Sequence, residues 1–132
     1  MSASPITCHV LDTLSGAPAS SLRVVLTLLT TTDAANGAVS YCFSGMTDED
    51  GRVKKWQPSV SGLSLQDAVK ELPDGKKTLW NLKFESNAWY EAKGVECFWS
   101  DIDVKFFFVA RSRHYHVPLL MGPWTYTTYR GS

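Results

Sequence analysis

The sequence predicts an all-β protein, an antiparallel β-sandwich formed by a single domain of residues 1–132 with one or two short helices. Most periodic segments alternate apolar and polar residues with a period of two, which is the side-chain period of a strand. Clusters of Gly, Pro, Asp and Ser separate these segments at spacings typical of strands joined by turns. With 132 residues, 44% of them hydrophobic and 20% charged, the chain is long enough to bury one core.

The first predicted strand covers residues 6–11 and presents two chemically different faces. Ile6 and Cys8 belong to the apolar face, whereas His9 belongs to the more polar one, because successive side chains of a strand point to opposite sides. Residues 12–21 contain Gly, Pro and several hydroxyl side chains, which predicts a loop.

Three more strands are predicted in the first half of the chain. They cover residues 22–30, which are rich in Val, Leu and Thr, and then residues 39–46 and 52–56. The dipeptide Asp50-Gly51 separates the last two, and both of its residues tolerate positive φ. This pattern predicts a hairpin between those two strands.

The middle of the chain is less regular. Within residues 57–77, apolar residues spaced i, i+4, i+7 from Leu65, with Ser64 in the N-cap position, predict a short helix over residues 64–72. Residues 86–93 predict one or two helical turns.

The second half of the chain supplies the remaining strands. Alternation of apolar and polar residues predicts four of them, at residues 78–85, 101–110, 113–121 and 124–130. The sequence shows no internal repeat and no low-complexity segment. We therefore expect seven or eight strands in the sandwich.

The composition excludes several functional classes. Thirteen basic and thirteen acidic residues cancel, so no electrostatic signal for nucleic acid is present. No apolar run reaches the roughly 18 residues of a membrane span, and the first residues lack the features of a signal peptide. Three widely spaced cysteines without a C-x-x-C motif are typical of a reducing compartment. We expect a cytoplasmic protein; the chain does not end in Ser-Lys-Leu, but a peroxisomal location stays open.

The segment His114-Tyr115-His116 brings two imidazoles to one face of a predicted strand. Three interpretations compete. The two rings, together with His9, are candidate zinc ligands with an open position for water. Alternatively, one histidine is a general acid or base whose pKa is adjusted by its neighbour. The third interpretation is a structural role at a polar interface, and the residues by themselves do not decide among the three.

Two other features carry candidate chemistry. Arg52 directly follows the Asp50-Gly51 turn, where its guanidinium is either a solvated charge or a fork of donors for an anionic or imide-like substrate. The ending Tyr129-Arg130-Gly131-Ser132 is unusually rich in functional groups, since Ser132 combines a hydroxyl with the terminal carboxylate. No G-x-S-x-G nucleophile motif and no glycine-rich phosphate loop is present.

Three blocks of the sequence resemble the 5-hydroxyisourate hydrolase family, the transthyretin-related enzymes of urate breakdown. The blocks are Thr7-Cys8-His9-Val10-Leu11-Asp12-Thr13 running to Pro18, then Asp50-Gly51-Arg52, and finally His114-Tyr115-His116-Val117-Pro118-Leu119-Leu120 running to Tyr129-Arg130-Gly131-Ser132. The last block is the most specific. Residues 57–77 are longer than the usual connection, and residues 121–124 depart from the usual pattern, but neither segment contains a candidate catalytic or binding residue.

The resemblance implies a transthyretin-like sandwich of two four-stranded sheets, assembled as a homotetramer that is a dimer of dimers. It implies hydrolysis of the N1–C6 amide of 5-hydroxyisourate to 2-oxo-4-hydroxy-4-carboxy-5-ureidoimidazoline, with no metal and no organic cofactor. The implied catalytic residues are His9, Arg52, His116 and Ser132. The implied substrate-binding residues are His9, Arg52, Tyr129 and Arg130.

Two alternatives from other classes remain. A transthyretin-like carrier of small ligands shares the implied fold, and fold alone does not determine function. A zinc-dependent cyclic amide hydrolase would use His9, His114 and His116 as ligands.

Overall fold

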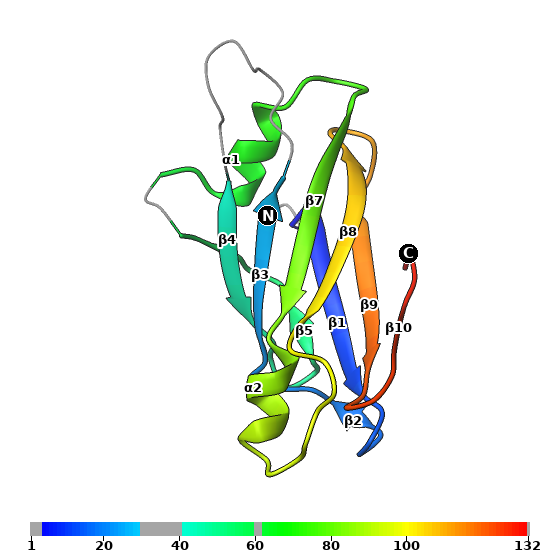
Figure 1. The fold of residues 1–132 in the computed structure, drawn as a ribbon. Helices are drawn as coiled ribbons and strands as arrows, with labels where there is room; N and C mark the ends of the chain where they lie inside the picture. Colours follow the sequence, from blue (N-terminus) through cyan, green and yellow to red (C-terminus); the bar gives the residue numbers. More distant parts are fainter. Residues whose placement is uncertain (1–3, 30–40, 60–61, 132) are drawn as a thin grey trace.

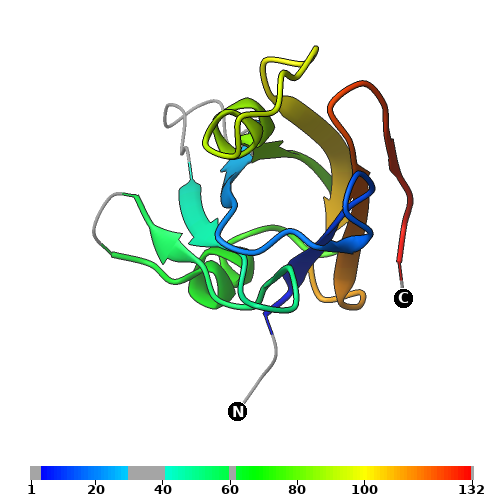
Figure 2. The same ribbon diagram turned by 90° about the horizontal axis from the view of Figure 1, so that it is seen from below.

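The computed structural model describes residues 4–29, 41–59 and 62–131, which form two β-sheets packed face to face (Figures 1 and 2). This arrangement confirms the predicted all-β sandwich. The elements in chain order are β1 Ile6–Asp12, β2 Ala17–Pro18, β3 Arg23–Leu28, β4 Cys42–Met46, β5 Arg52–Val53, β6 Gln57–Pro58, α1 Leu65–Lys70, β7 Lys77–Phe84, α2 Ser86–Glu91, β8 Ile102–Val109, β9 Tyr115–Met121 and β10 Tyr126–Thr128.

Each sheet contains five strands, not the four implied by the resemblance. The first sheet has the order β10-β9-β1-β2, with β5 also paired to β1, and the second has the order β6-β4-β3-β7-β8. Three of these strands, β2, β5 and β6, are only two residues long, and each pairs with a short part of a longer neighbour, β1 or β4.

The sandwich is not wholly antiparallel, because β1 and β9 pair in parallel over seven register positions. These two strands are not joined by a hairpin: the chain leaves the second sheet at the end of β8 and enters the first sheet at β9 (Figure 1). A crossing of this kind leaves the direction of β9 free, whereas a hairpin forces neighbouring strands to be antiparallel.

The predicted hairpin at Asp50-Gly51 is wrong, since β4 pairs within the second sheet and β5 pairs with β1 in the first. The turn instead carries the chain from one sheet to the other. The Asp48 carboxylate closes this turn by accepting hydrogen bonds from the backbone N–H groups of Asp50 (2.9 Å) and Arg52 (3.0 Å). Gly51 has a φ of 78°, and a Cβ there would collide with the carbonyl oxygen of Val10.

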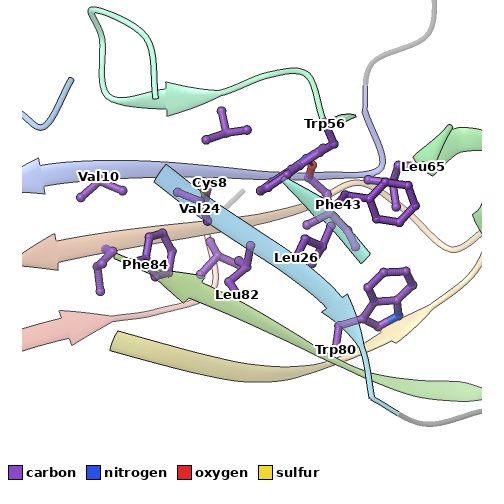
Figure 3. Packing of buried hydrophobic residues seen from close by; sticks show 14 of the residues in the cluster. Cys8, Val10, Val24, Leu26, Phe43, Trp56, Leu65, Trp80, Leu82 and Phe84 are labelled. Atoms are coloured by element: carbon purple, nitrogen blue, oxygen red, sulfur yellow. Dashed lines mark hydrogen bonds between the residues drawn. The ribbon is translucent and has the colours of Figure 1, made fainter. Parts of the chain in front are cut away.

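A continuous hydrophobic core fills the space between the sheets (Figure 3). The alternation predicted from the sequence is visible in the strands: in β1 every second residue is buried, and β7 repeats the pattern. The largest fully buried side chains include Trp80, Phe43 and Phe84. Burial of such a side chain stabilises a protein by about 1.5–3 kcal/mol. The core therefore holds the two sheets together.

Both predicted helices are present. Ser64 caps α1, and its hydroxyl accepts a hydrogen bond of 3.1 Å from the backbone N–H of Asp67. Helix α2 follows β7 and buries Tyr90, whose hydroxyl donates to the Asp12 carboxylate at 2.6 Å. That contact ties α2 to the end of β1. Among the described residues, neither helix is long and apolar enough to cross a membrane.

The last predicted strand, residues 124–130, is shorter in the structure and ends at Thr128. In the register of β9 and β10, Thr128 faces Leu119, so the position after it faces Pro118. Proline has no N–H to donate, so the ladder of backbone hydrogen bonds stops there. The Thr128 hydroxyl donates to the Pro118 carbonyl at 2.8 Å, and backbone pairing with β9 resumes at Gly131.

Candidate active site

The central strands of the first sheet bring three predicted site residues to one outer face. In the register of this sheet His9 on β1 pairs with Arg52 on β5, and His116 on β9 pairs with Thr7 on β1. The side chains that alternate with them, Cys8 and Val53, point into the core. The rings of His9 and His116 have centroids 6.4 Å apart, so the structure places both imidazoles on the face that carries Arg52.

A pocket of about 190 Å³ lies on this face. Five of its seven lining residues have polar or charged side chains, and they include both histidines of the His114-Tyr115-His116 segment. The lining residues are Thr7, Cys8, Arg52, Val53, Lys54, His114 and His116.

A chain of hydrogen bonds links the ring of His116 to Thr7, His114 and Ser4. Its Nδ1 lies 2.7 Å from the hydroxyl oxygen of Thr7, which lies 2.9 Å from Nε2 of His114. Nδ1 of His114 in turn lies 2.8 Å from the backbone carbonyl oxygen of Ser4. Both ring nitrogens of His114 are therefore engaged, and neither offers a free lone pair to a metal ion.

This geometry does not favour the zinc alternative. Zinc needs three protein ligands around a common point, and His114 was one of the three proposed. Within residues 4–29, 41–59 and 62–131, no group of three His, Cys, Asp or Glu side chains is arranged to hold a metal ion.

The electrostatic environment keeps His116 neutral. Its pKa is lowered from the ordinary histidine value first by burial, then by the positive charge of Arg52, and further by His114 and His9. A neutral imidazole at neutral pH has a lone pair with which to accept a proton. The site therefore supplies a base, next to cationic groups suited to stabilise developing negative charge on an oxygen.

The C-terminal tail borders the same site. Gly131 pairs with His116, and its N–H donates to the His116 carbonyl at 2.9 Å. The Arg130 guanidinium lies 4.7 Å from the centre of the Tyr115 ring. A second pocket of about 430 Å³ is lined by Arg113, His114, Tyr129, Arg130 and Gly131.

Five of the predicted site residues are thus placed, with His9, Arg52 and His116 on one face and Tyr129 and Arg130 on the neighbouring tail. Ser132 lies outside the described residues.

The sequence-based interpretation missed Thr7 as a member of the site, and Arg113, which lines the tail pocket, was not among its candidate residues either. A signal for Thr7 was available, because it lies two residues before His9 and so shares its face of β1. Its partner His116 is 109 residues away in sequence, and no local pattern connects the two.

Comparison with known proteins gives a consistent result. The model of the HIUase/Transthyretin family matches residues 6–131. A mouse (Mus musculus) 5-hydroxyisourate hydrolase is 34% identical over 129 residues, which cover 98% of this chain and 96% of the mouse protein. The structure of Klebsiella pneumoniae 5-hydroxyisourate hydrolase superposes with a TM-score of 0.67 at 24% identity, covering 100% of both chains.

Sea bream transthyretin in complex with thyroxine also superposes, with a TM-score of 0.72 at 23% identity over 96% of this chain and 94% of the transthyretin chain. At this level of identity the two structural matches speak for the fold alone. The family match and the mouse relative both extend over nearly the whole sequence. The chain therefore belongs to the HIUase/Transthyretin family.

Proposed function

We propose that this protein is a 5-hydroxyisourate hydrolase of urate degradation, which opens the six-membered ring at the N1–C6 amide to give 2-oxo-4-hydroxy-4-carboxy-5-ureidoimidazoline. The observation that carries the proposal is the meeting of His9, Arg52 and His116 on one face, with Gly131 of the tail paired to His116. Relatives named 5-hydroxyisourate hydrolase over nearly the full length of the chain support the same activity.

Amide hydrolysis needs an activated water, stabilisation of the carbonyl oxygen and a proton for the leaving nitrogen. In this proposal His9 and His116 share the proton transfers. Arg52 binds the substrate and polarises its carbonyl, which suits a planar guanidinium with several donors. Tyr129 and Arg130 hold the substrate, and Ser132 positions the water.

The reaction as proposed uses no metal and no organic cofactor. A histidine base, a guanidinium and a hydrogen-bonded water supply each of the required elements. Activity that survives dialysis against EDTA, in protein that elemental analysis finds free of zinc, is the expected result. Loss of activity with EDTA that zinc restores would contradict it.

We propose further that the working form is a homotetramer, a dimer of dimers. Exposed aromatic residues of this chain offer apolar surface for such contacts; Phe107 is 57% and Trp124 61% exposed. Sedimentation equilibrium should give four times the mass of one chain, and a mass that stays at one or two chains would contradict the proposal. A cytoplasmic location stays a prediction, which fractionation of cells would test.

The carrier alternative has only the fold in its favour, because the likeness to sea bream transthyretin is at 23% identity. No feature of the described residues favours it over the hydrolase.

The activity is tested by generating 5-hydroxyisourate in place with urate oxidase and following its ultraviolet decay. The protein should accelerate the decay, and His9→Asn or His116→Asn should lower kcat roughly 10²-fold or more, which is the usual worth of general acid–base catalysis. Lys83→Gln is a control, since Lys83 lies on β7 in the other sheet and the change removes only a partly exposed ion pair with Asp101. No acceleration by the wild-type protein would end the proposal.

A further inference from the structure

We infer that Thr7 and His114 are positioning residues, which hold His116 in the tautomer with its proton on Nδ1 and leave its Nε2 bare. This arrangement assigns the general base of the site to His116 and not to His9. The reaction step rests on the hydrolase activity proposed above, whereas the tautomer itself follows from the hydrogen bonds and is measurable without substrate.

The contact with Ser4 decides which group is the donor in each of the three hydrogen bonds. A backbone carbonyl oxygen only accepts hydrogen bonds, so the 2.8 Å contact between the Ser4 oxygen and Nδ1 of His114 requires a proton on that nitrogen. A neutral imidazole carries a single N–H, and its other nitrogen is an acceptor. Nε2 of neutral His114 is therefore a lone pair.

The next link is the hydroxyl of Thr7. It lies 2.9 Å from Nε2 of His114, to which it must donate, because that nitrogen has no proton. A hydroxyl has a single proton to donate. The 2.7 Å contact between Thr7 and Nδ1 of His116 must then be donated by His116. With the proton on Nδ1, Nε2 of neutral His116 is bare.

The opposite direction requires a different charge state. If Thr7 donated to Nδ1 of His116, it would accept from Nε2 of His114, and His114 would have to donate from both nitrogens. A histidine that donates from both nitrogens is an imidazolium cation. If both rings are neutral, all three contacts are satisfied in only one way. His116 donates to Thr7, Thr7 donates to His114, and His114 donates to Ser4.

A bare Nε2 is what a general base needs. As the water oxygen forms its bond to the C6 carbonyl carbon, one of its protons passes to Nε2, and the electron pair of that O–H bond stays on the attacking oxygen. The π electron pair of the carbonyl moves to the carbonyl oxygen, beside Arg52. The Nδ1 proton stays in its hydrogen bond to Thr7 and orients the ring, the task that a buried carboxylate performs for histidine in a catalytic triad.

The pairing of the strands places Thr7 next to His116. Thr7 and His116 are register partners on the adjacent parallel strands β1 and β9, and the rings of His114 and His116 lie nearly parallel, at 21°, with centroids 6.2 Å apart. Among the residues that the structure describes, none forms a hydrogen bond with the ring of His9. The described hydrogen bonds therefore orient the ring of His116 and not that of His9.

The test compares Thr7→Val with Thr7→Ser. Valine keeps the β-branched shape of threonine and its preference for strands but removes the hydroxyl, whereas serine keeps the hydroxyl. Long-range ¹H–¹⁵N NMR spectra of the histidine rings, recorded at about pH 8 where neutral imidazole predominates, report which nitrogen carries the proton.

In the wild-type protein His116 should show a protonated Nδ1 and a bare Nε2. Thr7→Val should shift His116 toward the Nε2–H form and lower kcat roughly tenfold, the effect of losing one hydrogen bond of about 1.4 kcal/mol. KM should change by less than about twofold, because Thr7 does not bind substrate in this scheme. Thr7→Ser should restore both the tautomer and most of kcat.

Each other outcome overturns the inference. A protonated Nε2 on His116 in the wild-type spectrum would refute the assigned direction. An unchanged tautomer or an unchanged kcat in Thr7→Val would refute the positioning role, and equal damage in Thr7→Ser would show a merely structural one. Failure of the hydrolase proposal is seen separately, as wild-type protein that does not accelerate 5-hydroxyisourate decay whatever the NMR spectra show.

Discussion

At the scale of single residues, the contacts of the site converge on His116. Thr7 on the neighbouring strand holds its Nδ1, Gly131 of the tail pairs with its backbone, and the rings of His9 and His114 lie near its own. A side chain held from several directions loses little further freedom when it reacts, which is the condition for effective acid–base catalysis.

The lowered pKa of His116 predicts an acid limit to activity below the ordinary histidine range. Burial contributes most to the lowering, followed by Arg52, so the base form persists as pH falls past about 6.5 and is lost at lower pH. We therefore expect the pH at which kcat/KM falls to half of its plateau to lie below the ordinary histidine value of about 6.5. The same lowered pKa contributes stability that is present above about pH 6.5 and is lost as pH falls through the folded-state pKa.

The contribution of Arg52 is measured by NMR titration of the His116 ring, which needs no turnover. Arg52→Gln should raise the pKa of His116, because a nearby positive charge disfavours the imidazolium. Lys54→Gln is the matched control: Lys54 lines the same pocket, but it is not among the causes of the lowering. An identical titration midpoint in wild-type protein and Arg52→Gln would contradict the assigned cause.

Gly131→Ala should lower the activity and leave the stability of the fold nearly unchanged. A Cβ at Gly131 would lie 2.8 Å from Cδ2 of His116 and 2.9 Å from Cγ of Pro118, so the tail would have to move away from β9. We expect kcat to fall roughly tenfold or more, as misplaced site groups commonly cause, while the free energy of unfolding changes by less than about 1 kcal/mol. The hydroxyisourate assay and urea unfolding measure the two quantities.

A control for Gly131→Ala is Thr127→Ala, a change at an exposed position of β10 that should leave kcat near the wild-type value. Turnover as fast in Gly131→Ala as in the wild-type protein would show that this close contact is not needed.

At the scale of elements, short strands and a turn deliver the site residues to the central strands. The two-residue strand β5 pairs with β1 and so places Arg52 beside His9. The crossing turn that precedes it depends on Gly51, whose positive φ and close approach to Val10 no other residue tolerates without strain. Strand β10 pairs with β9 over three residues and leads the tail back along it.

Removal of residues 129–132 should abolish activity and leave a folded protein. The three register pairs between β9 and β10 lie before the deleted segment, and the buried core contains none of the deleted residues that the structure describes. Circular dichroism and urea unfolding should therefore match the full-length protein, while the hydroxyisourate assay shows no acceleration. A truncated protein that still turns over substrate would rule out a functional tail.

At the scale of the whole molecule, one buried polar contact joins three elements at the end of the sandwich away from the histidines. The Tyr90 hydroxyl of α2 lies 2.6 Å from a carboxylate oxygen of Asp12 on β1 and 3.1 Å from the Met121 carbonyl on β9. Burial, which favours the protonated acid, is outweighed by the hydrogen bonds from Tyr90, Ser15 and Leu14, so the pKa of Asp12 is lowered. This contact links the parallel pair β1–β9 to the helix.

Tyr90→Phe should destabilise the fold without changing the chemistry. It leaves the aromatic ring in place but removes the donor to a buried carboxylate, which costs about 1–3 kcal/mol in free energy of unfolding. Urea unfolding measures that loss, and kcat should stay within about twofold of the wild-type value. Tyr126→Phe, at an exposed position, should change stability by less than about 0.5 kcal/mol. Equal stability of the two variants would contradict a stabilising role for the Tyr90–Asp12 contact.

The sequence by itself determined which residues face the core and which face outward. Alternation identified the buried side of β1 and β7, and a serine cap identified α1. A spacing of two residues brought the rings of His114 and His116 to one side of the chain where β9 begins. The match of three sequence blocks to a known family indicated the fold and the candidate site residues, and the structure brings three of these candidates, His9, Arg52 and His116, to one face.

Only the tertiary structure decided which strands are neighbours. It paired β1 with β9 in parallel, turned the expected hairpin at Asp50-Gly51 into a crossing between sheets, and brought Thr7 within hydrogen-bond distance of His116. The physical reason is that the alternation of apolar and polar residues indicates only which face of a strand is buried. Strand order and register depend on how two apolar surfaces pack across the core. In our inference such a contact, between residues 109 positions apart in the chain, decides which ring nitrogen of His116 carries the proton.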